Sequence, residues 1–311
     1  MKQLNNTDLN ELAKTLPTIA KSSKSANSIK KYSFAFNKFK SWCTNYDVCA
    51  LPASVTTIAV DISYLVQREV SISVLYSAYY GIKWEHDLNL FTSIFSEQFI
   101  KMILEGSIRI LSKPVKKKEP ITSDILKTIL RKQYPIDNLQ KLRICCLLLF
   151  GYAGFLRFNE LAQIRASNLK FSDSHLEILI ESSKTDIYRQ GHTVVIARTN
   201  NDTCPVVMCE KYLLKADIAL DSDDFIFRSL SFFKSKDTYR LCKINKPLSY
   251  TRARELLLEA LTQAGLEKTN FGLHSLRSGG VSEAAYNRIP ERLLKAHGSL
   301  ISLKMCILKK I

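Results

Sequence analysis

The stretch ICCLLLFGYAGFLRFNEL, residues 144–161, places a long apolar run directly before an arginine and a glutamate. The run is shorter than the roughly 20 residues that cross a bilayer, so it predicts a buried core helix. Arg157 follows it, where a buried guanidinium is unfavourable unless an anion or a carboxylate meets it. Glu160 comes one helical turn later, and a structural Arg157–Glu160 pair is therefore one interpretation of this segment.

The composition indicates a globular protein with a polyanionic partner. The chain has 311 residues, of which 46% are hydrophobic, so it can bury a core and is expected to form two domains. The net charge of +16 favours nucleic acid over an anionic membrane surface as the partner. The start lacks the pattern of a secretory signal, and the scattered cysteines are typical of reduced thiols. We therefore expect an intracellular protein, nuclear if the organism is a eukaryote.

The sequence predicts no metal and no cofactor. Cys204 and Cys209 are close in the sequence, but no second pair stands at the spacing of metal ligands, so packing is the simpler interpretation. There is no cluster of acidic residues for a two-metal site and no glycine-rich loop for a nucleotide.

The organisation along the chain predicts two domains joined by a basic linker. Residues 1–20 are expected to be a flexible tail, and residues 21–111 carry helical apolar periodicity, predicting a compact helical domain. Residues 112–122, SKPVKKKEPIT, combine prolines with a lysine run and predict the linker. Residues 123–311 are then the second domain, with two segments of β pattern, HLEILIE and HTVVIA, that predict a hairpin. The fold class is therefore mainly α with a small β-sheet.

Basic residues in the first domain and the linker are candidates for contact with DNA phosphates. In residues 25–43 the apolar positions form one stripe of a helix, which leaves the lysines for solvent or phosphate. The candidate DNA contacts are Lys30, Lys31, Lys38, Lys40, Lys116, Lys117 and Lys118.

Four further residues of the second domain suit the chemistry of a phosphate. Taken alone, Lys184 is an exposed turn lysine of the predicted hairpin, and His297 is an ordinary histidine at a helix end. His274 and Arg277 lie one turn apart, so both can point at one ligand, and the glycines that follow allow close backbone approach. Together with Arg157 they suit phosphoryl transfer, because guanidinium groups bind non-bridging oxygens while lysine and imidazole move protons.

These fragments in this order resemble the tyrosine recombinases, the phage-integrase type of DNA breaking and rejoining enzymes. AGFLRFNEL resembles the first arginine box, SSKTDIYRQG the hairpin lysine, HSLRSGG the His-x-x-Arg box and LLKAHGS the His/Trp position. The resemblance covers about residues 25–302. It implies an N-terminal helical core-binding domain of the SAM-like type, a C-terminal tyrosine-recombinase catalytic domain, and double-stranded DNA as partner.

The resemblance also implies catalytic roles. Arg157 and Arg277 would hold the scissile phosphate, Lys184 would act as general acid toward the 5′ oxygen, and His274 and His297 would assist proton transfer. A tyrosine hydroxyl would attack the phosphorus and form a covalent phosphotyrosyl link, which stores the bond energy for rejoining.

That tyrosine is expected shortly beyond His297, where this sequence reads SLKMCILKKI. We therefore expect a catalytic domain that is truncated at its C-terminal end, binds DNA without cleaving it, and oligomerises weakly on DNA. Two alternatives stay open: an active recombinase whose 3′ end is wrongly predicted, and a domesticated DNA-binding module.

Overall fold

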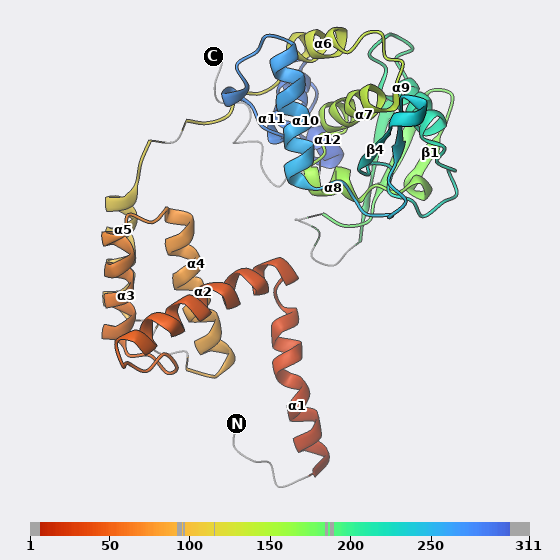
Figure 1. Ribbon diagram of the computed structural model, residues 1–311. Helices are drawn as coiled ribbons and strands as arrows, with labels where there is room; N and C mark the ends of the chain where they lie inside the picture. The colour runs from red at the N-terminus through yellow and green to blue at the C-terminus, as the bar shows by residue number, and fades with distance from the viewer. Residues whose placement is uncertain are drawn as a thin grey trace. The chain divides into compact units, whose positions relative to one another are not determined.

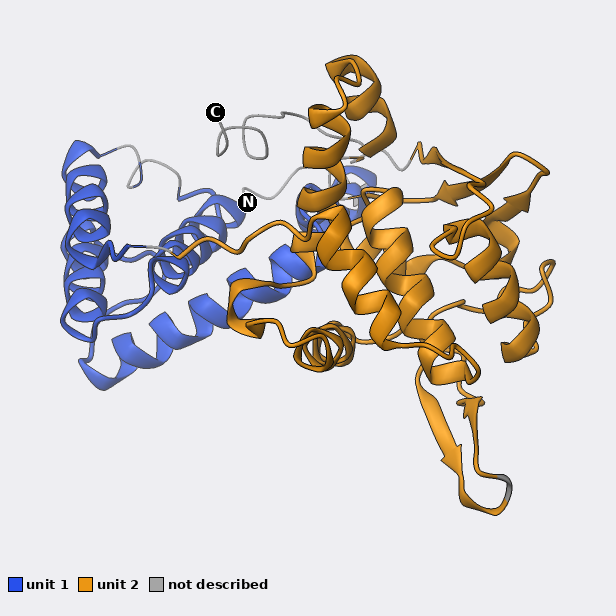
Figure 2. Ribbon diagram, turned by 90° about the horizontal axis from the view of Figure 1, so that it is seen from above, with its two compact units in different colours: residues 1–115 blue, residues 116–311 orange. Residues whose placement is uncertain are grey.

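The computed structural model describes residues 7–91, 95, 97–114, 116–183, 186 and 190–298. The chain forms two compact units, residues 1–115 (unit 1) and residues 116–311 (unit 2), shown in blue and orange in Figure 2. The division between the units falls inside the predicted linker of residues 112–122.

Unit 1 is built from helices whose starts are set by serine side chains. Ser25, Ser54 and Ser71 each accept a hydrogen bond from the backbone N–H of the third following residue, as N-cap residues do. α2 packs along α4, and α3 packs along α5. The helices of unit 1 are α1 (Thr7–Ser22), α2 (Ala26–Asn45), α3 (Val55–Gln67), α4 (Ile72–Leu88) and α5 (Gln98–Leu111) (Figure 1).

Helix α1 differs from the sequence-based expectation, which places residues 1–20 in a flexible tail. In residues 7–22 the apolar side chains recur at helical spacing, which favours a helix. The sequence-based expectation rested on the polar composition of the segment and not on this spacing. These side chains are exposed, unlike the buried stripes of the following helices. They are Leu9, Leu12, Leu16 and Ile19.

His86 and Asp61 are buried inside unit 1. The Nε2 of His86 accepts a hydrogen bond from the backbone N–H of Ala53 at 2.9 Å, and its Nδ1–H donates to the carbonyl of Ile82 at 2.8 Å. These bonds anchor the loop before α3 to the last turns of α4. Asp61 of α3 is only 4% exposed, and burial raises the pKa of its carboxyl from 3.8 to about 7.

Unit 2 packs helices against a small antiparallel sheet. β1, β2 and β3 form a three-stranded sheet in that order, and β4 pairs with β5 in a separate hairpin. The β2–β3 pair is the hairpin that the sequence predicts. The elements are α6 (Ser123–Lys132), α7 (Leu139–Ala153), α8 (Phe158–Gln163), β1 (Leu169–Phe171), β2 (His175–Ile180), β3 (His192–Ala197), α9 (Pro205–Ala216), β4 (Leu230–Phe233), β5 (Thr238–Leu241), α10 (Tyr250–Gln263), α11 (His274–Tyr286) and α12 (Glu291–Gly298).

Helix α7 lies in the middle of unit 2, with α10 and α11 on one side and α9 and the strands on the other (Figure 1). Its residues from Leu142 to Gly151 are all buried, as expected of a helix that is apolar on every face. The predicted core helix is therefore confirmed.

Helix α11 lies unusually close to its neighbours because it carries two consecutive glycines. A Cβ added at Gly279 would lie 1.8 Å from the carbonyl oxygen of Ile121, and one added at Gly280 would lie 2.1 Å from that of Tyr152. The N–H of Ile121 also donates to the carbonyl of Ser275 at 2.9 Å. The close backbone approach predicted at these glycines is thus confirmed, and the last residues of the predicted linker pack against unit 2.

No helix among the described residues combines the length and the apolar character that a membrane crossing requires.

The stability of unit 1 should depend on the ionisation of Asp61. A raised carboxyl pKa means that the folded state binds the proton more tightly than the unfolded state, so stability is greatest below the unfolded pKa. As the pH rises from about 4 to about 7, the free energy of unfolding falls by roughly 4 kcal/mol at the most. Asp61→Asn should abolish this part of the pH dependence. Urea unfolding followed by tryptophan fluorescence reports on unit 1 alone, because both tryptophans, Trp42 and Trp84, lie there.

Asp47→Asn provides the control, since Asp47 is exposed and its left-handed backbone also suits asparagine. Equal pH dependence in the wild type and Asp61→Asn would contradict the prediction.

Candidate active site

The site begins where α7 ends and α8 starts. Arg157 is the N-cap residue of α8, and Glu160 reaches back to it: one carboxylate oxygen accepts the Arg157 backbone N–H at 2.7 Å, and the other accepts Nη1 of the guanidinium at 2.8 Å. A glutamate at the third helical position closes a capping box in this way. Glu160 is 4% exposed and the Arg157 side chain 25%, so the carboxylate is buried beneath an accessible guanidinium.

Arg277 of α11 approaches the same carboxylate. Its Nη1 lies 3.5 Å from Oε2 of Glu160, and its side chain is 3% exposed. The guanidinium also donates to the carbonyl of Phe155 and, at 2.6 Å, to that of Gly298. One buried carboxylate therefore lies between two arginines, and the three side chains together carry a net charge of +1.

Phe155 holds its carbonyl toward Arg277 through an unusual backbone conformation. Its φ of 49° lies in the left-handed region, which a bulky side chain rarely adopts. The ring is buried against Val281 and Leu294, and it meets the ring of His297 edge-on at a centroid distance of 4.7 Å. These contacts offset the strain of the left-handed conformation.

His297 of α12 is held by the end of α7. Its Nε2 lies 2.9 Å from the carbonyl oxygen of Ala153, so the Nε2–H tautomer donates this bond. The ring contact with Phe155 fixes its orientation further. The segments of residues 153–157 and 297–298 are thereby brought together around Arg277.

His274 opens α11 and is exposed. Its pKa is lowered, first because neighbouring atoms displace water from the ring, and then because of the positive charges of Arg277 and Arg157. The imidazole is therefore neutral at pH 7 and able to donate a hydrogen bond without carrying charge.

The sequence analysis did not identify His192, the first residue of β3. Burial lowers its pKa, the carboxylates of Glu160 and Asp186 raise it, and the guanidinium groups of Arg157 and Arg277 lower it. His192 thus lies within the electrostatic field of the arginine pair. His192 follows Lys184 by eight residues and begins the second strand of the predicted hairpin. This position could have identified His192 as a candidate site residue from the sequence.

The remaining predicted site residues are placed as follows. Lys184 lies outside the described residues. Every predicted DNA-contact lysine is exposed on its own unit, and within the part of the chain that the structure describes only Lys118 among them has a hydrogen bond to the protein, from Nζ to the carbonyl of Thr269. Lys38 lies over the ring of Phe34 at 4.8 Å, which leaves its charge accessible to a ligand.

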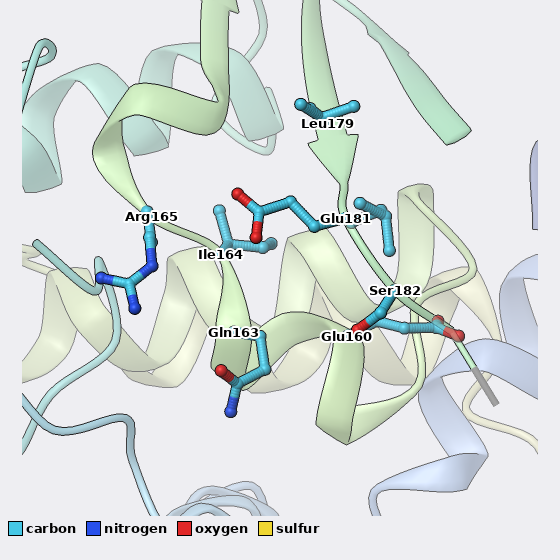
Figure 3. A pocket seen from close by; sticks show the side chains of 8 residues that line it. Glu160, Gln163, Ile164, Arg165, Leu179, Glu181 and Ser182 are labelled. Carbon is cyan, nitrogen blue, oxygen red and sulfur yellow. The ribbon is translucent and has the colours of Figure 1, made fainter. Parts of the chain in front are cut away.

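A small cavity lies beside α8, and Glu160 is among the residues that line it (Figure 3). The cavity encloses about 150 Å³. Glu160 lines it, whereas Arg157, His274, Arg277 and His297 are not among the described residues of its lining. Figure 3 shows the carboxylates of Glu160 and Glu181 pointing in different directions, and Glu181 accepts a hydrogen bond from Asn168 at 2.9 Å. The cavity does not bring the two carboxylates together on one ligand.

The cysteine pair of α9 belongs to the core. Cys209 is fully buried, and the sulfur of Cys204 accepts the N–H of Thr199 at 3.3 Å. Within the described ranges, no group of His, Cys, Asp and Glu side chains is arranged to hold a metal ion.

Comparisons with known proteins show the family and the fold of the chain. Residues 120–298 match the model of the phage integrase family. An integrase/recombinase xerD homolog from Selenomonas ruminantium is 26% identical over 276 residues, which cover 86% of this chain and 76% of the relative.

Solved structures share the fold. The XerH site-specific recombinase, in a pre-cleavage complex with difH substrate, matches with a TM-score of 0.55 and 13% identity over 87% of this chain and 72% of that one. The Tn1549 transposon integrase, in complex with circular intermediate DNA, matches with a TM-score of 0.53 and 12% identity over 82% of this chain and 80% of that one.

Replacing Glu160 should destabilise unit 2 strongly. Glu160→Leu leaves Arg277 buried without its counter-charge, which lowers the free energy of unfolding by about 3–5 kcal/mol. Glu160→Gln should lower it less, because the amide oxygen still accepts the N–H of Arg157. Hydrogen exchange measured by mass spectrometry in α8 and α11 reports the effect.

Glu177→Gln is the matched control, because Glu177 pairs with Lys170 at the surface and should change stability by less than about 1 kcal/mol. If α8 and α11 were equally protected from hydrogen exchange in Glu160→Leu and in this control, a central role for the Glu160 carboxylate would be contradicted.

Proposed function

The chain belongs to the phage integrase family, and from that premise we propose that it binds double-stranded DNA and holds one backbone phosphate at the cluster of Arg157, His274, Arg277 and His297. The observation that carries the proposal is the pair of guanidinium groups on one buried carboxylate. Glu160 fixes both arginines before a ligand arrives and leaves net positive charge for the phosphate.

Each residue then has a role in strand transfer. Arg157 and Arg277 neutralise the non-bridging oxygens, and His274 donates a hydrogen bond to an oxygen that gains charge. His297 donates to the phosphate once its Nε2–H has left the carbonyl of Ala153. If a tyrosine is supplied to the site from elsewhere, its hydroxyl passes its proton to a neutral imidazole and attacks the phosphorus, the bond to the 5′ oxygen breaks, and Lys184 protonates that oxygen as it leaves. His192 lies in the electrostatic field of the same cluster.

The two arginines differ in how a phosphate reaches them. The Arg157 side chain is 25% exposed, whereas Arg277 is 3% exposed and donates to the carbonyls of Phe155 and Gly298. A phosphate therefore contacts Arg157 first, and it reaches Arg277 by taking the place of a backbone carbonyl.

The charge of the chain and its relatives support DNA as the ligand. The net charge of +16 and the exposed lysines of α2 suit a polyanion. XerH and the Tn1549 integrase were solved with DNA.

Residues 299–311 contain no tyrosine, so we propose that the 311-residue chain by itself binds DNA without cleaving it. Weak assembly on DNA, and an intracellular location that is nuclear in a eukaryote, belong to the same proposal.

Loss of either arginine should weaken duplex binding. Arg157→Gln and Arg277→Gln should each lower the affinity about tenfold or more, because each removes a charge-assisted bond to phosphate. Arg252→Gln, whose guanidinium is paired with Glu255 and Glu259 on α10, is the control. Gel retardation across a salt series should also show the logarithm of the binding constant falling linearly with the logarithm of the salt concentration. Equal binding of duplex DNA, RNA and anionic vesicles at the same salt would overturn the proposal.

The absence of a tyrosine after His297 predicts no covalent product. The 311-residue chain, incubated with a duplex that carries a phosphorothiolate at the exchange point, should give no protein–DNA band that survives denaturation. Such a band would refute the cleavage defect and favour an active recombinase.

A further inference from the structure

The β4–β5 hairpin is a feature of unit 2 that the arginine cluster does not use. Leu230 pairs with Leu241 at its base and Phe233 with Thr238 near its turn. The base is fixed, because Leu230 and Leu241 pack against the core and the N–H of Cys242 donates to the carbonyl of Ser229 at 2.9 Å. The hairpin therefore holds its turn in a defined position.

Two consecutive phenylalanines are exposed near the turn. Phe232 is 47% exposed and Phe233 45%, and as neighbours in a strand they point to opposite faces. Phe232 contacts its cross-strand partner Tyr239 at a centroid distance of 5.0 Å. The role of the Phe232 ring is therefore to form a cross-strand aromatic pair that stabilises the hairpin. Phe233 faces Thr238 and has no such aromatic partner.

A cation orients the ring of Phe233. The guanidinium of Arg240 lies 5.0 Å from the ring centroid and covers one face. Lys234, directly after Phe233, is also exposed. Among the residues that the structure describes, neither Arg240 nor Lys234 forms an ion pair with a carboxylate, and the exposed Asp237 adds one negative charge at the turn. The hairpin thus combines an oriented aromatic ring with two cations that have no ion-pair partner among the described residues.

We propose that the β4–β5 hairpin binds unpaired bases of a nucleic acid strand, with Phe233 stacking on a base and the surrounding cations contacting phosphates. Bases inside a duplex are stacked on each other and closed to such a ring, so the site requires bases that have left their pairs. The net charge of +16 favours a polyanion over a protein partner at this hairpin.

The inference rests on the proposed function for the identity of the polyanion and extends it to a second contact. Unpaired strands occur wherever a duplex is mismatched or opened, so this contact needs no cleavage by the chain. A ring that stacks on bases without hydrogen-bond readout would hold such strands whatever their sequence.

The test compares a fully paired duplex with the same duplex carrying a short mismatched bubble, by fluorescence anisotropy with the full chain. Phe233→Ala should weaken binding to the bubble about tenfold and leave duplex binding unchanged. Phe233→Trp should bind the bubble at least as well as the wild type, whereas Phe233→Leu should behave like Phe233→Ala. Phe99→Ala, which removes an exposed phenylalanine of α5, is the matched control.

The outcomes separate the two proposals. A wild-type chain that binds neither DNA overturns the proposed function. A wild-type chain that binds both, with Phe233→Ala unchanged on the bubble, overturns the hairpin inference alone. Full affinity in Phe233→Leu, or equal loss on duplex and bubble, also overturns it, because stacking then plays no part. A change of sedimentation coefficient in Phe233→Ala without DNA identifies the hairpin as a contact between copies of the chain and overturns it too.

Discussion

The carboxylate of Glu160 lies between the guanidinium groups of Arg157 and Arg277, at 2.8 and 3.5 Å. It caps the first turn of α8 and meets α11, so one side chain joins local helix formation to the packing of distant elements. A buried carboxylate and a buried guanidinium are each unfavourable alone, and together they are stable only in this geometry. The position of both arginines therefore depends on Glu160.

The hydrophobic core positions these polar groups through backbone carbonyls. The end of α7 and the residues just after it supply the carbonyls of Ala153 and Phe155, which accept bonds from His297 and Arg277. The glycines of α11 bring that helix against Ile121 and Tyr152, closer than any side chain would allow. Apolar packing of α7 and α11 thus determines where the cations of the site lie.

The electrostatic character of the site follows from this packing. Loss of water from part of the ring and the two guanidinium groups lower the pKa of His274, although the residue as a whole is exposed, and burial outweighs the nearby carboxylates in lowering the pKa of His192. Both imidazoles are neutral at pH 7, while the arginines keep their charge. The site therefore attracts an anion through arginine and offers neutral imidazoles for hydrogen bonding.

Local sequence patterns were enough to predict the apolar helix α7, the β2–β3 hairpin and the shared helix face of His274 and Arg277, because periodicity and spacing act over a few residues. The tertiary structure decided that Arg277 meets Glu160, that His192 enters the field of the arginines and that a second hairpin presents Phe233, since these depend on packing between segments far apart in the chain. It also revealed α1, whose apolar stripe is hidden in a polar composition. The sequence thus determined which chemical groups the protein carries, and the packing of α7 against α11 decided which of them act together.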